Sequence, residues 1–454
     1  MPKQRITFPH KLCNVTSLYL ILIIFILMLW SCKKSTDPVF NSPKFQLKVK
    51  EVTSTEVWLS LKAHDAFQGN TFKLSRSDSL VLNLTLTLTD TLFLDEGLEP
   101  ATTYGYKAAI FDADKIVGRS ARVTATTMDT TSHDFTRNDF HFGKGLATSV
   151  FYDVSIINEN QIWAVGEIHT SETDRWNEDS TKWIQPYNAV HWDGQEWELK
   201  RIKTKGCGGV VYPTIKTVFA FAEDDILFAH IDGSITFYDG SKFRNDCSLI
   251  AQLNESARKI WGVSSKDFYV VSGNGFIAHY DGNYWRRIES GTDLPIQDIW
   301  GNTVNEKSRN ILTVASLVNN TPPPKLLGIR QNQLRSIYLT IYRSLHSVWF
   351  KTLNKIYLCG AGIFYRTNPE VKWSEVDNHP LIFTYRIRGS EHNNIWTVGA
   401  LGFIVHYNGK TWKQISNARI SGRHYYGLDV KNHLAVAVGY DQGNAIITRM
   451  KLNP

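Results

Sequence analysis

An internal repeat constrains the fold of this chain more than any other feature of its sequence. One copy occupies residues 260–285 and a second occupies residues 387–412. Both contain a strand ending in glycine, an apolar strand, a third strand that closes on His-Tyr, an Asp-Gly or Asn-Gly turn, and then a tryptophan. A repeat of this length indicates one supersecondary unit stacked on copies of itself.

Weaker copies are found by following the first strand of the repeat along the chain. The corresponding apolar residues are Val154, Val218, Ile260, Ile299, Val348, Ile387 and Val430. Their separations are 64, 42, 39, 49, 39 and 43 residues, and the two long ones coincide with insertions at residues 168–187, 302–307 and 319–324. Seven units of about 40 residues predict an all-β fold over residues 138–454, a β-propeller of about seven four-stranded blades.

The turns and the end of the repeat refine this prediction. Tight hairpins need residues with positive φ, and four turns carry glycine after Asp or Asn: Gly194, Gly240, Gly282 and Gly409. The last unit stops after residues 445–450 without a turn or an outer strand. Because a propeller needs a closed ring, we expect residues near 138–144 to supply the fourth strand of the last blade.

Three histidines recur at one position of the repeat: His191, His279 and His406. Zinc would need them at about 2.0 Å from one centre, whereas equivalent positions of separate blades lie apart around the ring. We therefore interpret them as structural and predict neither a metal site nor a cofactor. Motifs of nucleotide-binding, hydrolase or metalloprotease sites do not occur in a suitable context.

Three aspartates directly precede first-strand residues and are the candidate catalytic groups: Asp153, Asp298 and Asp429. Inner strands line the channel of a propeller, so we expect these carboxylates to share one register and to face the channel. Two acids brought together across the axis would suit glycoside hydrolysis. The alternative, which we favour, is hydrogen bonding to neighbouring backbone, because buried polar groups are normally satisfied locally.

The cysteines are too few for a disulfide scaffold. Cys207 follows the outer strand of the first predicted blade, and Cys247 follows that of the second. Adjacent blades bring such positions near each other, and an exported compartment permits oxidation. Cys207 and Cys247 are therefore a candidate disulfide, whereas Cys359 has the surroundings of a buried strand thiol.

A separate domain is expected over residues 43–128, followed by a linker at 129–137. Short alternating runs between Asp, Gly and Ser clusters predict seven strands, typical of an antiparallel sandwich. The segment Leu98-Glu99-Pro100-Ala101-Thr102-Thr103-Tyr104 resembles the L-x-P-x-T-x-Y corner of fibronectin type III domains. The resemblance implies that the Tyr104 hydroxyl bonds back to the corner, that Trp58 is the tryptophan this family buries on its second strand, and that the domain is a spacer or adhesive unit.

The N-terminus has the order of an export signal. Three cations and no acid precede an apolar run from Leu18 to Trp30, whose 13 residues fall short of the roughly 20 that span a bilayer. Leu29-Trp30-Ser31-Cys32 resembles the lipobox of bacterial lipoproteins. This implies a signal peptide over residues 1–31, then a lipidated Cys32 and a linker to residue 42. A bacterial cell-envelope protein, lipid-anchored in the outer membrane, is expected.

Charge and motifs leave binding as the leading function. Removal of the signal peptide lowers the formal net charge from +7 to +4, a small excess that argues against a nucleic-acid binder. The organisation resembles that of uncharacterised propeller lipoproteins of the Bacteroidetes type. We expect a binding or scaffold protein, not an enzyme, that contacts the membrane through its lipid and a protein or glycan through its propeller. The alternative is a carbohydrate-active enzyme, a glycosyl transferase or hydrolase, that uses channel carboxylates.

Overall fold

The computed structural model describes residues 45–453, apart from residues 64–66, 89, 209–210, 254, 306–307, 319–320, 369–371, 378–381 and 416–419. The predicted signal peptide, Cys32 and the linker to residue 42 lie outside the described residues. The fold of the described part is all-β. Within that part, none of the chain forms a helix of the length and hydropathy needed to cross a membrane.

The first described strands form a two-sheet sandwich. They are β1 (Phe45–Val52), β2 (Glu56–Ala63), β3 (Thr71–Arg76), β4 (Ser79–Thr85), β5 (Asp90–Glu96), β6 (Thr103–Asp112), β7 (Lys115–Arg119) and β8 (Val123–Thr126). One sheet has the order β1-β2-β5 and the other has the order β4-β3-β6-β7, with β8 also paired to β6. These eight strands are one more than the seven predicted, and the chain turns tightly between β6 and β7 at Ala113, where φ is 50°.

Alternation along β2 builds the sandwich core. Val57, Leu59 and Leu61 are fully buried in it, as the two-residue period of a strand requires. At the corner before β6, the backbone N–H of Glu99 donates to the Tyr104 hydroxyl at 3.0 Å. This is the contact that the fibronectin-like motif implies, and it ties the corner to β6.

The rest of the described chain contains seven four-stranded sheets, the blades of a β-propeller. Blade 1 is β10 (Val150–Asn158), β11 (Gln161–Ile168), β14 (Tyr187–Trp192) and β15 (Trp197–Lys200). Blade 2 is β16 (Ile215–Ala222), β17 (Asp225–His230), β18 (Ile235–Tyr238) and β19 (Phe243–Asp246). Blade 3 is β20 (Lys259–Ser264), β21 (Asp267–Val271), β22 (Ile277–Tyr280) and β23 (Trp285–Arg287). Blade 4 is β24 (Ile296–Asn305), β25 (Ser308–Ala315), β26 (Lys325–Arg330) and β27 (Gln333–Ile337). Blade 5 is β28 (Leu345–Phe350), β29 (Lys355–Gly360), β30 (Gly362–Thr367) and β31 (Ser374–Glu375). Blade 6 is β32 (Thr384–Glu391), β33 (Asn394–Gly399), β34 (Ile404–Tyr407) and β35 (Trp412–Gln414). Blade 7 is β36 (Arg423–Lys431), β37 (Leu434–Asp441), β38 (Asn444–Leu452) and β9 (Phe135–Phe142). These sheets confirm the predicted fold class.

The first strands of the blades form the inner ring. Each of β10, β16, β20, β24, β28, β32 and β36 contacts the next, and β36 contacts β10. The seven apolar residues that define the repeat all lie on these strands and are buried. The insertion at residues 168–187 holds a separate hairpin of β12 (Arg175–Trp176) and β13 (Trp183–Ile184).

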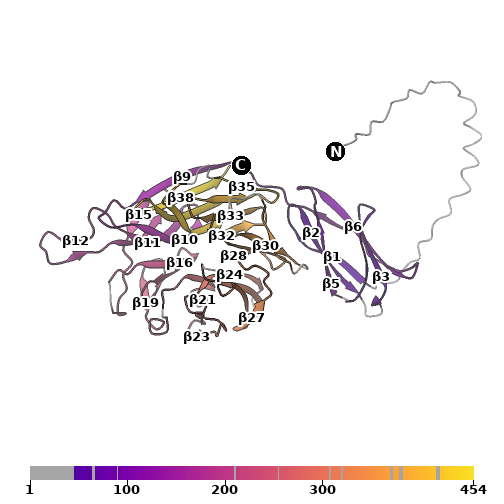
Figure 1. The fold of residues 1–454 in the computed structure, drawn as a ribbon, viewed down its shortest axis with the longest axis horizontal. Helices are drawn as coiled ribbons and strands as arrows, with labels where there is room; N and C mark the ends of the chain where they lie inside the picture. The colour runs from indigo at the N-terminus through magenta and orange to yellow at the C-terminus, as the bar shows by residue number, and fades with distance from the viewer. Residues whose placement is uncertain are drawn as a thin grey trace, which may run out of the picture. The chain divides into compact units, whose positions relative to one another are not determined.

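The ring is closed by the strand that precedes the first blade. In Figure 1, β9 lies beside the yellow β38, and the two pair antiparallel from Phe135 with Leu452 to Phe142 with Ala445. The ring of Phe142 also packs against Trp197 of blade 1, with centroids 6.3 Å apart. The predicted closure is confirmed, although the strand begins three residues before residue 138.

The four turn glycines adopt the positive φ for which they were singled out. The angles are 102° at Gly194, 86° at Gly240, 97° at Gly282 and 100° at Gly409. At Gly409 a Cβ would lie 2.2 Å from Oγ of Ser54 in the sandwich. A side chain at this turn would therefore collide with the sandwich.

Trp58 faces away from the core of its own domain. It alternates with the core residues Val57 and Leu59, so its indole lies on the opposite face of β2, yet it is fully buried. Its Nε1 donates to the carbonyl of Asn368, just beyond β30 of blade 5, at 2.6 Å. Trp58 is thus buried as expected, but strand alternation points it at the propeller and not into the core of the sandwich.

Buried charges join the sandwich to blades 5 and 6. Lys355 Nζ lies 2.6 and 2.8 Å from the carboxylate oxygens of Glu56, and both residues are buried. Glu51 accepts from Nε2 of His392 at 2.6 Å, and this contact helps to hold the pKa of Glu51 below its usual value against the opposing effect of burial. The sandwich is therefore fixed to the propeller within one compact unit, which differs from a loosely tethered spacer.

Candidate functional site

Pairing between the first and second strands skips one residue near the start of the inner strand. The skipped residues are Tyr152, Lys216, Gln297, His346, Tyr385 and Tyr426. In blade 3 the same place is held by Arg258, directly before Lys259, and its backbone N–H bonds to the carbonyl of Val271 at 2.8 Å. Bulges re-aim a side chain out of the regular ladder. We call these seven residues, one from each blade, the mouth ring.

Cations occupy one half of the mouth ring. Lys216 Nζ lies 3.2 Å from the centroid of the Tyr152 ring, a cation–π contact between blades 1 and 2. Arg258 donates to Oε1 of Gln297 and to a carboxylate oxygen of Glu255, both at 3.0 Å. Burial, with the nearby charge of Arg258, lowers the pKa of Lys216 to about 8.

Aromatic rings occupy the other half. The Tyr385 and Tyr426 rings meet edge to face with centroids 5.3 Å apart, across blades 6 and 7. His346 of blade 5 places Nδ1 2.8 Å from the carbonyl of Tyr385, and its ring centroid lies 5.3 Å from that of Tyr385. Burial and the charge of Arg386 lower the pKa of His346 to about 4, so this half is uncharged at neutral pH.

The residue after each mouth-ring residue belongs to a second layer, deeper along the axis. This axial layer is Asp153, Thr217, Lys259, Asp298, Ser347, Arg386 and Gly427. Its charged members are almost fully buried. In six blades a one-residue step along the strand therefore separates a partly exposed side chain from a buried one, whereas in blade 4 Gln297 is itself buried.

Asp153 is held by blades 2 and 3. Both of its carboxylate oxygens lie within 2.7 Å of Lys259 Nζ. The hydroxyl of Thr217 donates to Oδ2 at 2.6 Å, and the backbone N–H of Val218 donates to the same oxygen at 3.2 Å. The favoured prediction of backbone hydrogen bonding is correct here, but it missed the buried lysine.

Asp298 is held by blades 5 and 6. Arg386 donates to Oδ1 at 2.8 Å, Arg388 donates to both oxygens at 2.8 and 2.9 Å, and the Ser347 hydroxyl donates at 2.5 Å. Burial by itself would raise the pKa of this carboxyl, but Arg388 and Arg386 outweigh burial and hold the pKa well below its usual value. Asp298 therefore stays ionised and has no proton to give at neutral pH.

The expectation that Asp429 shares this register is wrong. Pairing in β36 skips Tyr426, so Gly427 holds the equivalent place, and a Cβ there would lie 2.8 Å from Cα of Asp153. Asp429 lies two residues further along the strand. Its carboxylate accepts the backbone N–H of Ile156 at 2.7 Å, which is again local hydrogen bonding.

A cavity of about 360 Å³ opens on the side of the axial layer away from the mouth ring, and Asp429, Lys259, Arg388 and Trp300 are among its lining residues. Burial raises the pKa of Asp429, while Lys259 and Arg388 partly oppose this rise. Its possible partner acids, Asp153 and Asp298, are already engaged by cations. The arrangement lacks the pair of available carboxyl groups that glycoside hydrolysis uses.

The recurrent histidines are each bonded within their own blade. Nε2 lies 2.6 to 3.2 Å from a side-chain oxygen on the second strand, and the imidazole stacks on an aromatic ring at 4.3 to 4.4 Å. The partners are Gln161 and Trp163 for His191, Asp267 and Tyr269 for His279, and Asn394 and Trp396 for His406. Across the residues that the structure describes, no group of three or more potential ligands could hold a metal ion.

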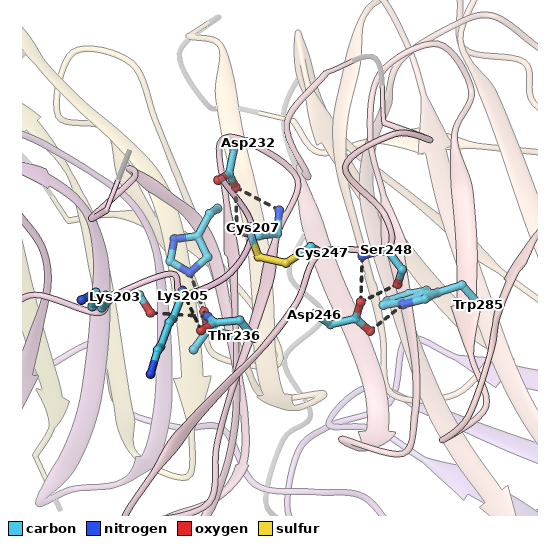
Figure 2. The surroundings of a disulfide bond; sticks show 12 residues. Lys203, Lys205, Cys207, Asp232, Thr236, Asp246, Cys247, Ser248 and Trp285 are labelled. Carbon is cyan, nitrogen blue, oxygen red and sulfur yellow. Dashed lines mark hydrogen bonds between the residues drawn. A yellow bond between two sulfur atoms is a disulfide. The ribbon is translucent and has the colours of Figure 1, made fainter. Parts of the chain in front are cut away.

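Cys207 and Cys247 form a disulfide, with Sγ atoms 1.99 Å apart and Cα atoms 5.2 Å apart. Figure 2 shows the bond between two loops, with Asp246 beside Cys247 accepting from Nε1 of Trp285 at 3.1 Å. The first loop leads from blade 1 into β16, and the second leads from blade 2 into β20. Cys359 is a free, buried thiol. The disulfide thus connects the loops that deliver Lys216 and Arg258 to the mouth ring.

Comparison with known proteins supports the fold alone. No protein-family model and no curated protein matches the chain. A solved structure described as YCF48 bound to D1 peptide is 14% identical, with a TM-score of 0.52, and the match covers 72% of this chain and 100% of that one. The WD40 β-propeller domain of Doa1 is 10% identical, with a TM-score of 0.51, and the match covers 71% of this chain and 98% of that one.

Sequence reasoning missed the mouth ring. Its signal is weak but present, because Lys216 and Arg258 stand two residues before the buried Val218 and Ile260. A polar residue at that offset in repeated first strands indicates a side chain outside the apolar ladder. The candidate aspartates drew attention to the layer beneath instead.

Proposed function

We propose that this protein is a binding module of the bacterial cell envelope, anchored by lipid on Cys32, that recognises a segment of a partner protein at the mouth ring. The observation that carries the proposal is the mouth ring itself, in which one residue from each blade, bulged in six of the seven, is gathered around one end of the propeller axis. Half-exposed cations and aromatic rings are the side chains that dominate recognition surfaces.

The comparisons support this proposal at the level of fold. One similar propeller is described as bound to a peptide. Propellers host many functions, so this likeness makes peptide recognition plausible and does not by itself assign it. The sandwich supports the proposal physically, because its buried contacts with blades 5 and 6 hold it in a fixed relation to the propeller.

The chemistry of the axis favours binding over the carbohydrate-active alternative. Asp153 and Asp298 each accept hydrogen bonds from a buried cation and a hydroxyl group. Only Asp429 among the three candidate acids lines the cavity without a direct ion pair. A single carboxyl with a raised pKa supplies one proton-transfer group where glycoside chemistry calls for two.

The test is affinity purification of the lipidated protein from its native envelope. Wild type is expected to bring down a stoichiometric partner that is lost in a Tyr385→Ala, Tyr426→Ala double variant. Lys431→Ala, an exposed change at the edge of the cavity on the opposite side of the axial layer, is the matched control and should retain the partner. Retention by the tyrosine variant with loss in the control would place the binding surface elsewhere. Cys32→Ser should release a folded protein from the membrane.

A further inference from the structure

We propose that the mouth ring binds a carboxylate group of a peptide, held by Lys216 and Arg258, with the adjoining apolar side chain of that peptide packed on Tyr385 and Tyr426. This inference rests on the proposed function and gives the partner segment a chemistry. The carboxylate has two possible sources, a free C-terminus or an Asp or Glu side chain, and both offer the same monoanionic group.

Lys216 supplies the available charge. Among the described residues it has no carboxylate within ion-pair distance, and its recorded contact is the face of Tyr152. Glu167 is the nearby acid, but it accepts the Thr214 hydroxyl at 2.9 Å and lies 3.4 Å from the His169 ring. A carboxylate entering the ring would therefore give Lys216 the ion pair that the chain itself does not provide.

Arg258 fixes the geometry beside that ammonium. Its guanidinium is held by Glu255 and Gln297, which limits its motion before a ligand arrives. Preorganised donors lose less entropy on binding than free ones. Glu255 already neutralises part of this charge, so the main attraction comes from Lys216 while Arg258 orients the group.

Arg386 reinforces the same end of the axis from below. It follows Tyr385 in the chain and is buried, with Nη1 bonded to Asp298, while its Nε has no hydrogen-bond partner among the residues that the structure describes. An unpaired buried donor costs free energy unless a partner or water reaches it. A ligand anion at the ring would be attracted by the charge of this buried guanidinium, which already acts on His346 of the ring.

The surrounding charges favour a monoanion over phosphate. Glu255 pairs with Arg258, while Glu167 lies near Lys216 without forming an ion pair with it, so the ammonium of Lys216 is the unmatched charge. A second negative charge on the ligand would be repelled by these acids, whereas one carboxylate is matched by the free ammonium. The three tyrosines then favour a neighbouring aromatic or aliphatic side chain on the same ligand.

A pH profile follows from the groups that face Lys216, which are Arg258, Glu167 and the Tyr152 ring. Burial and Arg258 lower the pKa of Lys216 to about 8, so the ammonium is present at pH 7 and is lost as the pH rises through 8. Carboxylate binding should weaken by roughly tenfold between pH 7 and pH 9.5. Lys216→Arg keeps a permanent charge and should bind almost equally at both values.

The experiment is a chemical-shift titration of the full exported chain with three probes. These are N-acetyl-Phe-Phe with a free carboxylate, its C-terminal amide, and N-acetyl-Glu-Phe-amide with a side-chain carboxylate. In wild type and in Lys216→Arg, the free acid should bind at least about tenfold more tightly than the amide. In Lys216→Met, the two affinities should differ by less than about twofold. If N-acetyl-Phe-Phe binds more tightly, the carboxylate of the partner is a free C-terminus. If N-acetyl-Glu-Phe-amide binds more tightly, it is a side-chain carboxylate.

Inorganic phosphate is the competing anion in the same titration. The inference is overturned if acid and amide bind with equal affinity, or if phosphate displaces the acid at equal concentration. Equal affinity would leave the proposed function standing, provided that the Tyr385→Ala, Tyr426→Ala variant still loses its envelope partner. If no probe shifts the resonances of the mouth ring and the Tyr385→Ala, Tyr426→Ala variant still retains its envelope partner, both the carboxylate inference and the proposed function are overturned.

Discussion

The axial layer and the mouth ring are neighbours in sequence and opposites in environment. Asp298 and Arg386 are buried and joined by an ion pair, while Tyr385, the residue before Arg386, is half-exposed at the end of the axis. In six of the seven blades a bulge makes this difference, because it turns two successive residues towards the axis at two depths. The comparison teaches that in this propeller one residue of register separates a structural position from a recognition position.

The largest expected effect comes from Asp298→Asn. This change leaves Arg386 and Arg388 buried without their counter-charge, and removing one partner of a buried ion pair costs about 3 to 5 kcal/mol. Urea unfolding followed by tryptophan fluorescence would measure the loss. Asp429→Asn is the control, because a carboxyl with a raised pKa gains little from its charge. Equal losses in the two variants would erase the distinction between the axial layer and its surroundings.

Removing the disulfide tests whether the mouth ring, unlike the axial layer, depends on the loops that lead into its strands. Cys207 and Cys247 enclose 40 residues, and loss of such a cross-link costs about 2 to 4 kcal/mol. The Cys207→Ser, Cys247→Ser double variant should therefore unfold at lower urea. It should also weaken carboxylate binding, because the joined loops position Lys216 and Arg258. Unchanged binding would show that the two cations are oriented by their strands alone.

Lowering the pH should change the contributions of Asp298 and Asp429 to stability in opposite directions. The folded-state pKa of Asp298 is lowered, so its stabilisation is present above the unfolded pKa and is lost as the pH falls below about 4. The folded-state pKa of Asp429 is raised, so its ionised form costs stability that acidification recovers. Relative to Asp429→Asn, wild type should therefore gain stability between pH 7 and pH 4. Parallel pH profiles of the two proteins would contradict this assignment.

No loss of stability is expected at the mouth ring. Lys216→Met removes a half-buried ammonium that burial disfavours, as its lowered pKa shows, and that has no carboxylate partner among the described residues, so the free energy of unfolding should not fall. Thermal unfolding of this variant beside Asp298→Asn measures both ends of the comparison. A loss near that of Asp298→Asn would make the mouth ring a structural layer as well.

Much of the fold could be predicted from the sequence because period and turn chemistry are local properties. The forty-residue spacing placed all seven inner strands, and the missing outer strand after residue 450 pointed to closure by the segment before blade 1. The corner contact of Tyr104 followed from a short motif. The repeat unit and the corner depend on residues that are close together in the chain, whereas ring closure, which pairs strands more than 300 residues apart, follows from counting the strands of the repeat.

The site could be predicted only in part, because its layout depends on register. Leu428 and Val430 are both apolar and two residues apart, so alternation cannot tell which of them matches Ile299. The bulge at Tyr426 decides the matter, and nothing in a single sequence marks it. Trp58 is a second example of what the sequence alone does not predict. Strand alternation places its side chain opposite the core residues of β2, but the surface that covers it comes from residues more than 300 positions away in the chain.

Closure of the ring by β9 has a consequence for the order of assembly. β9 is the first propeller strand to leave the ribosome, and its partner β38 is the last. Until residues 444–452 emerge, both β9 and the outer edge of β37 present unpaired backbone groups, which are templates for unwanted strand pairing. The nascent propeller therefore stays an open, aggregation-prone ribbon until its final residues arrive, and any truncation near the C-terminus would trap it in that state.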